Sequence, residues 1–356
     1  MKINLSQKIF AYRKPFGLES GIVLPQYHLA YTTLGVLNPE KDNVVWIFHA
    51  LTANSNPAEW WPGLVGEGKL FDPSRYFIVC VNMPGSCYGS LGPLDINPLT
   101  GEAYYHDFPF FTTRDMVRAY QPLKDFLGIE RIHMGIGGSM GGQQLLEWAI
   151  EAPDLFEYIF PIATNAQHSP WGIAFNTSQR MSIEADASWK ERQPLAGIDG
   201  MKAARATALI SYRHYETYLQ AQPRSNAFPF GDGWDGAASY QRYQGEKLAR
   251  RFNAFSYYVL SQSMDAHNVG RGRGTAENAL HTIRARTLTI GIETDILFPL
   301  QEQQFLATHI PAATYKTIDS GYGHDGFLLE YESIGRLITE YIQQKKTTSN
   351  TFAVIT

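Results

Sequence analysis

Cysteine is scarce in this chain: Cys80 and Cys87 are the two cysteines among its 356 residues. Two cysteines cannot build a disulfide framework, and they cannot supply all the ligands of a thiolate metal site. We therefore expect both as reduced thiols in a cytoplasmic protein that has no structural metal ion.

Long apolar runs and a strong charge of one sign are also absent. No apolar run is long enough to cross a bilayer, and residues 1–6 lack the apolar core of a signal peptide. The 30 basic and 34 acidic side chains leave a net charge of −4, and the Gly-Arg-Gly-Arg-Gly segment at 270–274 is too short for an RNA-binding tract. Neither a membrane nor a nucleic acid is therefore an expected partner.

The most informative stretch that is present is Gly-Gly-Ser-Met-Gly at residues 137–141. It follows an apolar run at 132–136 and precedes a helical pattern at 143–150. Strand, Gly-x-Ser-x-Gly and helix form the nucleophile elbow of the α/β-hydrolase fold, in which a sharp turn lifts the serine hydroxyl above the sheet. The alternative is a glycine-rich turn with an incidental serine. We predict that Ser139 is a nucleophile.

The acid and the base of such a triad follow the serine in the order Asp or Glu, then His. Asp295 comes directly after a strand pattern at 287–292, and His324 lies in a glycine-rich loop after the next strand pattern at 313–318. A turn aspartate and a loop histidine would explain each residue separately, and Glu293 is an alternative acid. The correct order on correctly placed elements favours a Ser139–Asp295–His324 triad.

An oxyanion hole requires two backbone N–H groups, one of them from the residue after the nucleophile, which is Met140. The second is expected from the loop that follows the strand pattern at 44–48. We assign it to Leu51, with Thr52 as the alternative. His49, in the same loop, is interpreted as a residue that shapes the loop.

The remaining patterns define the organisation of the chain. Strands at 76–81 and 158–163 and a helix at 114–127 alternate in a way that favours a mostly parallel sheet covered on both faces, although Pro161 weakens the second strand. Between residues 165 and 287 only helical patterns occur, at 172–185, 201–220 and 245–263, with a polar stretch at 222–237. We predict a hydrolase core at 1–165, a helical lid at 166–282, and a second core segment at 283–356. The last segment contains a closing helix at 327–343 and, from Lys345, a partly disordered tail.

Several longer segments resemble the homoserine O-acetyltransferases of methionine biosynthesis. They cover residues 49–52, 82–93, 113–117, 138–142, 270–274 and 322–326. Gly-Ser-Cys-Tyr-Gly-Ser-Leu-Gly-Pro at 85–93 and Gly-His-Asp-Gly at 323–326 are the most specific of them. The match spans nearly the whole chain, and its departures at 53–55, Pro84 and Leu91 do not touch the predicted triad.

The resemblance implies three substrate-binding residues. The family's arginine and tyrosine fall on Arg205 and Tyr212, seven residues apart and so on one face of a helix, with the small Ala208 between them. An arginine suits an α-carboxylate bidentately. Asp325 is implied as the partner of the α-ammonium group. The alternatives are a solvated arginine, a core tyrosine, and an aspartate that caps the helix beginning near residue 327.

The implied reaction moves an acetyl group from acetyl-CoA, a co-substrate, to the hydroxyl of L-homoserine through acyl-Ser139, without a metal or redox cofactor. The alternatives are homoserine O-succinyltransferase, serine O-acetyltransferase, a serine esterase or thioesterase, and a binding protein without catalysis. Family members pair through the lid. We expect a homodimer on the lid helices, because Phe252, Phe255, Tyr257, Tyr258 and Val259 are too many apolar residues for one lid to bury.

Overall fold

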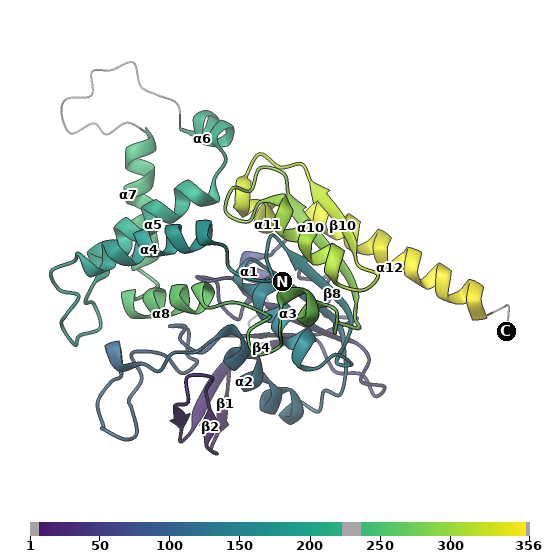
Figure 1. Ribbon diagram of the computed structural model, residues 1–356, viewed down its shortest axis with the longest axis horizontal. Coiled ribbons are helices and arrows are strands. Elements are labelled where there is room, and N and C mark those ends of the chain that lie inside the picture. The colour runs from purple at the N-terminus through teal and green to yellow at the C-terminus, as the bar shows by residue number, and fades with distance from the viewer. Residues whose placement is uncertain (1–6, 223–235, 354–356) are drawn as a thin grey trace.

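The computed structural model describes residues 7–222 and 236–353, and an eight-stranded sheet lies at its centre (Figure 1). The strand order is β1-β4-β6-β5-β7-β8-β9-β10, in which the run from β6 to β10 is parallel while β1 and β4 pair antiparallel at one edge. Its strands are β1 (Lys8–Tyr12), β4 (Tyr27–Leu34), β5 (Val44–Phe48), β6 (Phe77–Val81), β7 (Ile132–Gly138), β8 (Phe156–Ile162), β9 (Arg286–Ile292) and β10 (Thr314–Ile318). The short strands β2 (Phe16–Gly17) and β3 (Val23–Leu24) pair separately.

Successive strand side chains point to opposite faces of the sheet, and helices cover and bury both faces. In β5, Trp46 packs with Trp148 on one face, under α2 (Thr113–Phe126) and α3 (Met140–Glu151), with α9 (Ala276–Leu280) and α10 (Leu300–His309) on the same side. Val45 and Ile47 belong to the core on the other face, which is covered by α1 (Pro57–Trp60), α11 (Gly326–Leu329) and α12 (Tyr331–Ala353). The predicted mostly parallel sheet with two covered faces is confirmed.

Pro161 lies within β8 despite the weakness it gave that strand prediction. It faces Gly137 of β7, whereas the ladder from β8 to β9 passes from Ile159 to Ile162 without a pair at Pro161. Because a proline has no N–H to donate, β8 keeps its pairing with β7 at this position, while its pairing with β9 is interrupted.

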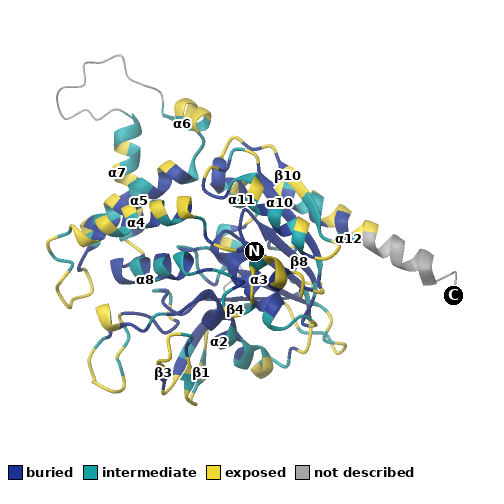
Figure 2. Ribbon diagram, viewed as in Figure 1, coloured by how far each residue is buried: buried dark blue, intermediate teal, exposed yellow. Residues whose placement is uncertain are grey.

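The region predicted as a lid is helical. It contains α4 (Pro170–Glu184), α5 (Ile198–Tyr212), α6 (Tyr215–Ala221), α7 (Gly236–Ala249) and α8 (Ala254–Asp265). Figure 1 shows α4, α5, α7 and α8 gathered on the side of the molecule opposite the end of α12, and Figure 2 shows that their outer faces are more exposed than the sheet. The boundaries at residues 165 and 282 stay predictions.

Two of the predicted lid helices are interrupted, which corrects their extents. The helix expected over 201–220 breaks at Arg213 and His214, whose extended backbone separates α5 from α6. The helix expected over 245–263 breaks before Asn253, whose side chain accepts from Ser256 N at 2.7 Å and caps α8. The polar stretch at 222–237 lies mostly outside the described residues.

Two further expectations need correction. The closing helix is divided into α11 and α12, and α12 continues to Ala353, so the tail from Lys345 is helical that far. In the lid, Phe252, Phe255 and Tyr257 are buried within the single chain, and Tyr258 and Val259 are half-buried. The single chain therefore buries three of these residues fully and two partly, and the three buried ones give no argument for a homodimer.

Both arginines of the 270–274 segment form ion pairs within the chain. Arg273 pairs with buried Glu147 of α3 at 2.8 Å, and Arg271 pairs with Glu19 at 2.7 Å. Arg114 of α2 contacts both acids, at 3.2 Å and 2.7 Å. This charged network connects the segment after α8 to α3, the helix that follows Ser139.

Candidate active site

Ser139 lies in the turn between β7 and α3, with φ 55° and ψ −128°. A non-glycine residue at positive φ costs on the order of 1–3 kcal/mol and persists only where its surroundings fix it. Here the Ser139 N–H donates to Ile162 O at 3.0 Å, and its carbonyl accepts from Thr164 Oγ1 at 2.8 Å. The elbow predicted from the glycine pattern is therefore present, with the serine held in a strained backbone conformation.

The glycines around Ser139 permit close approaches that a side chain would prevent. A Cβ on Gly137 would lie 2.4 Å from Gly141 O, and one on Gly141 would lie 2.2 Å from Phe48 O. A Cβ on Gly138 would meet the ring of Phe327 at 2.3 Å. The elbow thus packs directly on the end of β5 and on the helix that follows the His324 loop.

Asp295 and His324 are brought together as the sequence predicted. His324 Nδ1 lies 2.6 Å from Asp295 Oδ2, and both side chains are almost fully buried. The other carboxylate oxygen, Oδ1, accepts from the backbone N–H groups of Leu297 and Phe298 at 2.8 and 2.9 Å. The alternative acid, Glu293, is exposed. These bonds fix the carboxylate that orients the imidazole, and the catalytic roles themselves stay predictions.

Three aromatic rings surround His324. Phe298 stacks on the imidazole with 5.0 Å between ring centroids, while Phe327 and Tyr212 lie at 5.2 and 5.6 Å. Phe327 also contacts the elbow at Gly138, so the same ring connects the histidine loop to the residue before Ser139. The rings limit the positions that the imidazole can take.

The two N–H groups proposed for the oxyanion hole are available. Leu51 and Met140 are buried, and within residues 7–222 and 236–353 neither backbone N–H has a hydrogen-bond acceptor. Met140 N–H is the first of α3, where the helix dipole also favours a negative charge. His49 shapes the loop, because its Nδ1 bonds to Ala50 O at 2.9 Å and its Nε2 accepts from Met83 N at 3.2 Å. Burial lowers the pKa of His49 to about 4.

Arg205 and Tyr212 lie on the same face of α5. The Arg205 guanidinium carbon is 5.5 Å from the centroid of the Tyr212 ring, and Tyr212 in turn packs on His324. Arg205 is half-buried and has no acidic partner among the residues that the structure describes. Burial raises the pKa of Tyr212. The structure thus places an uncompensated cation one aromatic ring away from His324.

Asp325 follows His324 and occupies the N-cap position of α11 (Gly326–Leu329), yet its side chain makes no capping hydrogen bond. Its Oδ2 instead lies 3.1 Å from Nη2 of Arg213, a residue that the sequence analysis missed. The alternative role of a helix cap is therefore not supported. The only sequence signal for Arg213 was its position directly after Tyr212.

A second histidine lies close to the site. His168 packs against Phe298 with 5.6 Å between ring centroids, and its Nε2 lies 3.2 Å from Asn176 Nδ2. Burial lowers the pKa of His168 to about 4. A neutral, buried imidazole that packs on Phe298 supports the packing of the site.

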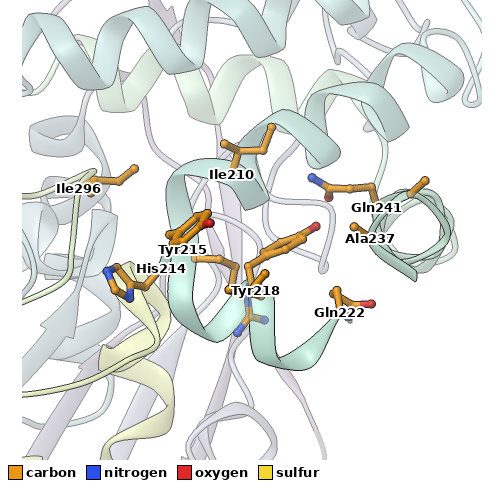
Figure 3. A pocket seen from close by; sticks show the side chains of 11 residues that line it. Ile210, His214, Tyr215, Tyr218, Gln222, Ala237, Gln241 and Ile296 are labelled. Carbon is orange, nitrogen blue, oxygen red and sulfur yellow. The ribbon is translucent and has the colours of Figure 1, made fainter. Parts of the chain in front are cut away.

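A cavity of about 830 Å³ lies between α5, α6, α7 and the loop after Asp295, and its described lining includes no residue of the predicted triad (Figure 3). Its lining is mainly apolar and aromatic, including Ile210, Tyr215, Tyr218 and Ile296. Arg213 lines it too, so this residue contacts both the cavity and Asp325. The cavity is of the size that proteins use for small ligands.

Metal and membrane features were searched over the same described residues. No group of three or more His, Cys, Asp or Glu side chains there could hold a metal ion. None of the helices found there is long and apolar enough to span a membrane.

Comparison with known proteins first defines the class. Residues 43–331 match the family model of the alpha/beta hydrolase fold. Homoserine O-acetyltransferase of Cyclobacterium marinum is 49% identical over 341 residues, with 96% of each chain covered. The chain belongs to the homoserine O-acetyltransferase family within the α/β-hydrolase fold.

Two solved structures show how widely this fold is shared. Homoserine O-acetyltransferase from Bacillus anthracis superposes with a TM-score of 0.88 at 24% identity, covering 96% of this chain and 98% of that one. Esterase E22 superposes with a TM-score of 0.86 at 23% identity, covering 95% and 99%. Since a transferase and an esterase share the fold, the fold alone does not identify the acceptor.

Proposed function

We propose that this chain transfers an acetyl group from acetyl-CoA to the hydroxyl of L-homoserine through an acyl-Ser139 intermediate, which gives O-acetyl-L-homoserine and CoA for methionine biosynthesis in the cytoplasm. The observation that carries the proposal is the pair of opposite charges around His324. Arg205 lies over the ring of Tyr212, and that ring packs against His324. Asp325 is the next residue after His324 in the chain. These charges match the carboxylate and the ammonium group of an amino acid.

In the first half-reaction, Asp295 accepts the Nδ1–H of His324, which leaves Nε2 free to take the Ser139 proton. The serine oxygen then attacks the thioester carbonyl, and the N–H groups of Leu51 and Met140 hold the oxyanion. Loss of one such donor typically costs ~10²–10³ in rate. His324 returns the proton to the departing CoA thiolate, so the half-reaction needs no metal or redox cofactor.

In the second half-reaction, the amino acid occupies the same site. Arg205 binds its carboxylate, with Tyr212 beneath the guanidinium, and Asp325 binds its ammonium group. His324 deprotonates the acceptor hydroxyl, which attacks the acetyl-serine carbonyl. The bond from the acetyl carbon to Ser139 Oγ then breaks, and His324 returns the proton to the serine oxygen. The charges that hold the acceptor therefore act after CoA has left.

The second candidate function is an esterase or thioesterase, in which water is the acceptor; the structural similarity to esterase E22 favours it. Both candidates use the same triad and the same acyl-serine. They differ in whether an amino acid accelerates deacylation, which is the step that Arg205 and Asp325 would serve.

One assay separates these candidates. Purified protein receives acetyl-CoA or succinyl-CoA, each with L-homoserine, with L-serine or without acceptor, and CoA release is followed. We expect fast release with acetyl-CoA and homoserine and slow release in the other combinations. Equal release with and without an acceptor would establish a hydrolase, and a preference for succinyl-CoA or serine would establish a different acyltransferase.

We also propose a homodimer through the lid helices, now on different residues from those expected. Ile210, Tyr215 and Leu219 on α5 and α6 are 59%, 75% and 58% exposed. Apolar side chains exposed together favour a protein–protein contact. Light scattering at micromolar concentration should give twice the chain mass, and Tyr215→Lys with Leu219→Lys should give a folded monomer. A monomeric unaltered protein would contradict this proposal.

A further inference from the structure

The break between α5 and α6 lies directly against the loop that carries His324. Gly323 has φ +63°, and a Cβ there would lie 2.9 Å from Tyr212 O and 3.0 Å from the backbone of Arg213 and His214. Thr217 of α6 donates a hydrogen bond to Gly321 O. The lid thus touches the catalytic loop by backbone contact, and Arg213 lies at the centre of that contact.

Arg213 binds Asp325 through a single pair of atoms. Its Nη2 lies 3.1 Å from Oδ2 of Asp325 and 3.5 Å from the hydroxyl of Tyr240 on α7. The two side chains of the ion pair are 23% and 13% exposed, so water competes weakly for them. The Arg213 Nε is buried and lacks a hydrogen-bond partner among the described residues. Asp325 is therefore the main polar partner of this guanidinium.

A carboxylate has about four lone-pair sites, and this contact occupies one oxygen. We propose that Arg213 is a positioning residue for the acceptor: it holds Oδ2 of Asp325 so that Oδ1 receives the substrate's α-ammonium group. The preference for amino-acid acceptors then depends on Arg213 as well as on Asp325. This inference rests on the proposed function and deepens it.

Two effects of removing Arg213 oppose each other. A positive charge that repels the ammonium group is lost, which would strengthen binding. The Asp325 carboxylate also loses the contact that fixes its orientation. The orientation effect is expected to dominate, because the ammonium group would contact Oδ1 directly, whereas the guanidinium lies at Oδ2 and repels the ammonium group from a greater distance.

The test compares two acceptors in Arg213→Gln. With L-homoserine, its KM should rise roughly tenfold or more, as expected when a hydrogen bond to a charged group is disturbed. The second acceptor, 4-hydroxybutanoate, has the carboxylate and hydroxyl of homoserine but no amine. Its KM, or its inhibition constant against homoserine, should differ by no more than about twofold between Arg213→Gln and the unaltered protein, because there is no ammonium contact to lose. Acetylation of Ser139 by acetyl-CoA alone should be unchanged.

Arg213→Lys retains the charge and should restore part of the homoserine affinity. In an Asp325→Asn background, Arg213→Gln should add little, since the two residues act on one contact. Arg192→Gln is the matched control, because Arg192 forms an exposed ion pair with Asp107 at 2.7 Å and lies before the other end of α5. Thermal unfolding of each variant establishes that it is folded.

The outcomes distinguish the two proposals. If homoserine fails to accelerate deacylation in the unaltered protein, the proposed function is wrong and this inference is wrong with it. If homoserine works but Arg213→Gln leaves its KM unchanged or lowers it, the inference alone is overturned. An equal rise for both acceptors would likewise overturn it, because a general structural defect would produce that result.

Discussion

At the scale of single residues, the strained Ser139 makes the most direct prediction. Acetyl-CoA without an acceptor should add one acetyl mass to the protein, and Ser139→Ala should remain unlabelled. Turnover should fall by roughly 10³-fold or more, because the nucleophile acts together with its base. Intact-protein mass spectrometry measures the label. Ser178→Ala on α4 is the control and should label normally, because the Ser178 hydroxyl donates to Ala174 O within its own helix. Unchanged turnover in Ser139→Ala would exclude the acyl-serine mechanism.

Arg205 separates a transferase from a hydrolase at the same scale. Arg205→Met should leave Ser139 acetylation nearly intact while weakening homoserine binding by about 2–5 kcal/mol, the usual cost of removing one partner of a desolvated charge pair. Arg205→Lys should restore little, since an ammonium cannot make the two-pronged contact. Single-turnover acetylation and steady-state transfer are measured for each variant. If both half-reactions slow equally, Arg205 has a structural role.

The sequence could predict Ser139, Asp295 and His324 as candidates because chain order and strand position define their places. It could not distinguish Asp295 from Glu293 by pattern; only the structure shows that Asp295 reaches Nδ1 of the imidazole. Arg213 was not predicted, because an arginine after a helix carries no local signal and its partner lies over a hundred residues away.

At the scale of elements, the elbow can be tested through Gly141 in the first turn of α3. Alanine is normally better than glycine in a helix by about 1 kcal/mol. A Cβ at this position would lie 2.2 Å from Phe48 O, so β5 and α3 would have to separate. Gly141→Ala should therefore destabilise the protein by about 2 kcal/mol or more despite its better propensity.

Urea unfolding measures this difference, and Gly17→Ala provides the control. A Cβ on Gly17 meets no atom within 4 Å, and its φ is not in the left-handed region. That variant should stay within about 0.5 kcal/mol of the unaltered protein. A stabilised Gly141→Ala would show that the elbow can relax, and that its glycines are not required by packing.

The helix breaks show where element prediction failed. Apolar periodicity continues through Arg213 and His214, so the pattern predicts one helix over 201–220. The helix ends at this point, where Gly323 of the histidine loop packs against the backbone. The local sequence does not reveal this contact, because Gly323 is distant in the chain. Strands β5 and β9 were predicted closely because fully buried strands are continuous apolar runs.

At the scale of the whole molecule, buried histidines make stability depend on pH. Burial lowers the pKa of His49 and His168 to about 4 and that of His267 to about 3. In the unfolded chain a histidine has a pKa of about 6.5. Below that pH these histidines bind protons in the unfolded chain but not in the folded protein. The stabilisation is thus fully present above pH ~6.5 and is lost as pH falls toward ~4.

Each of the three histidines should contribute a slope of about 1.4 kcal/mol per pH unit within that window. Urea unfolding at pH 7.5, 6.0 and 5.0 should therefore show a steep loss of the unfolding free energy below pH 6.5. His267→Gln should be less stable at neutral pH, because His267 contacts Thr113 Oγ1 and Asn165 O. Its unfolding free energy should depend less steeply on pH, because one proton fewer is taken up on unfolding. Equal stability at pH 7.5 and 5.0 would mean that these imidazoles are hydrated and protonate within the folded protein.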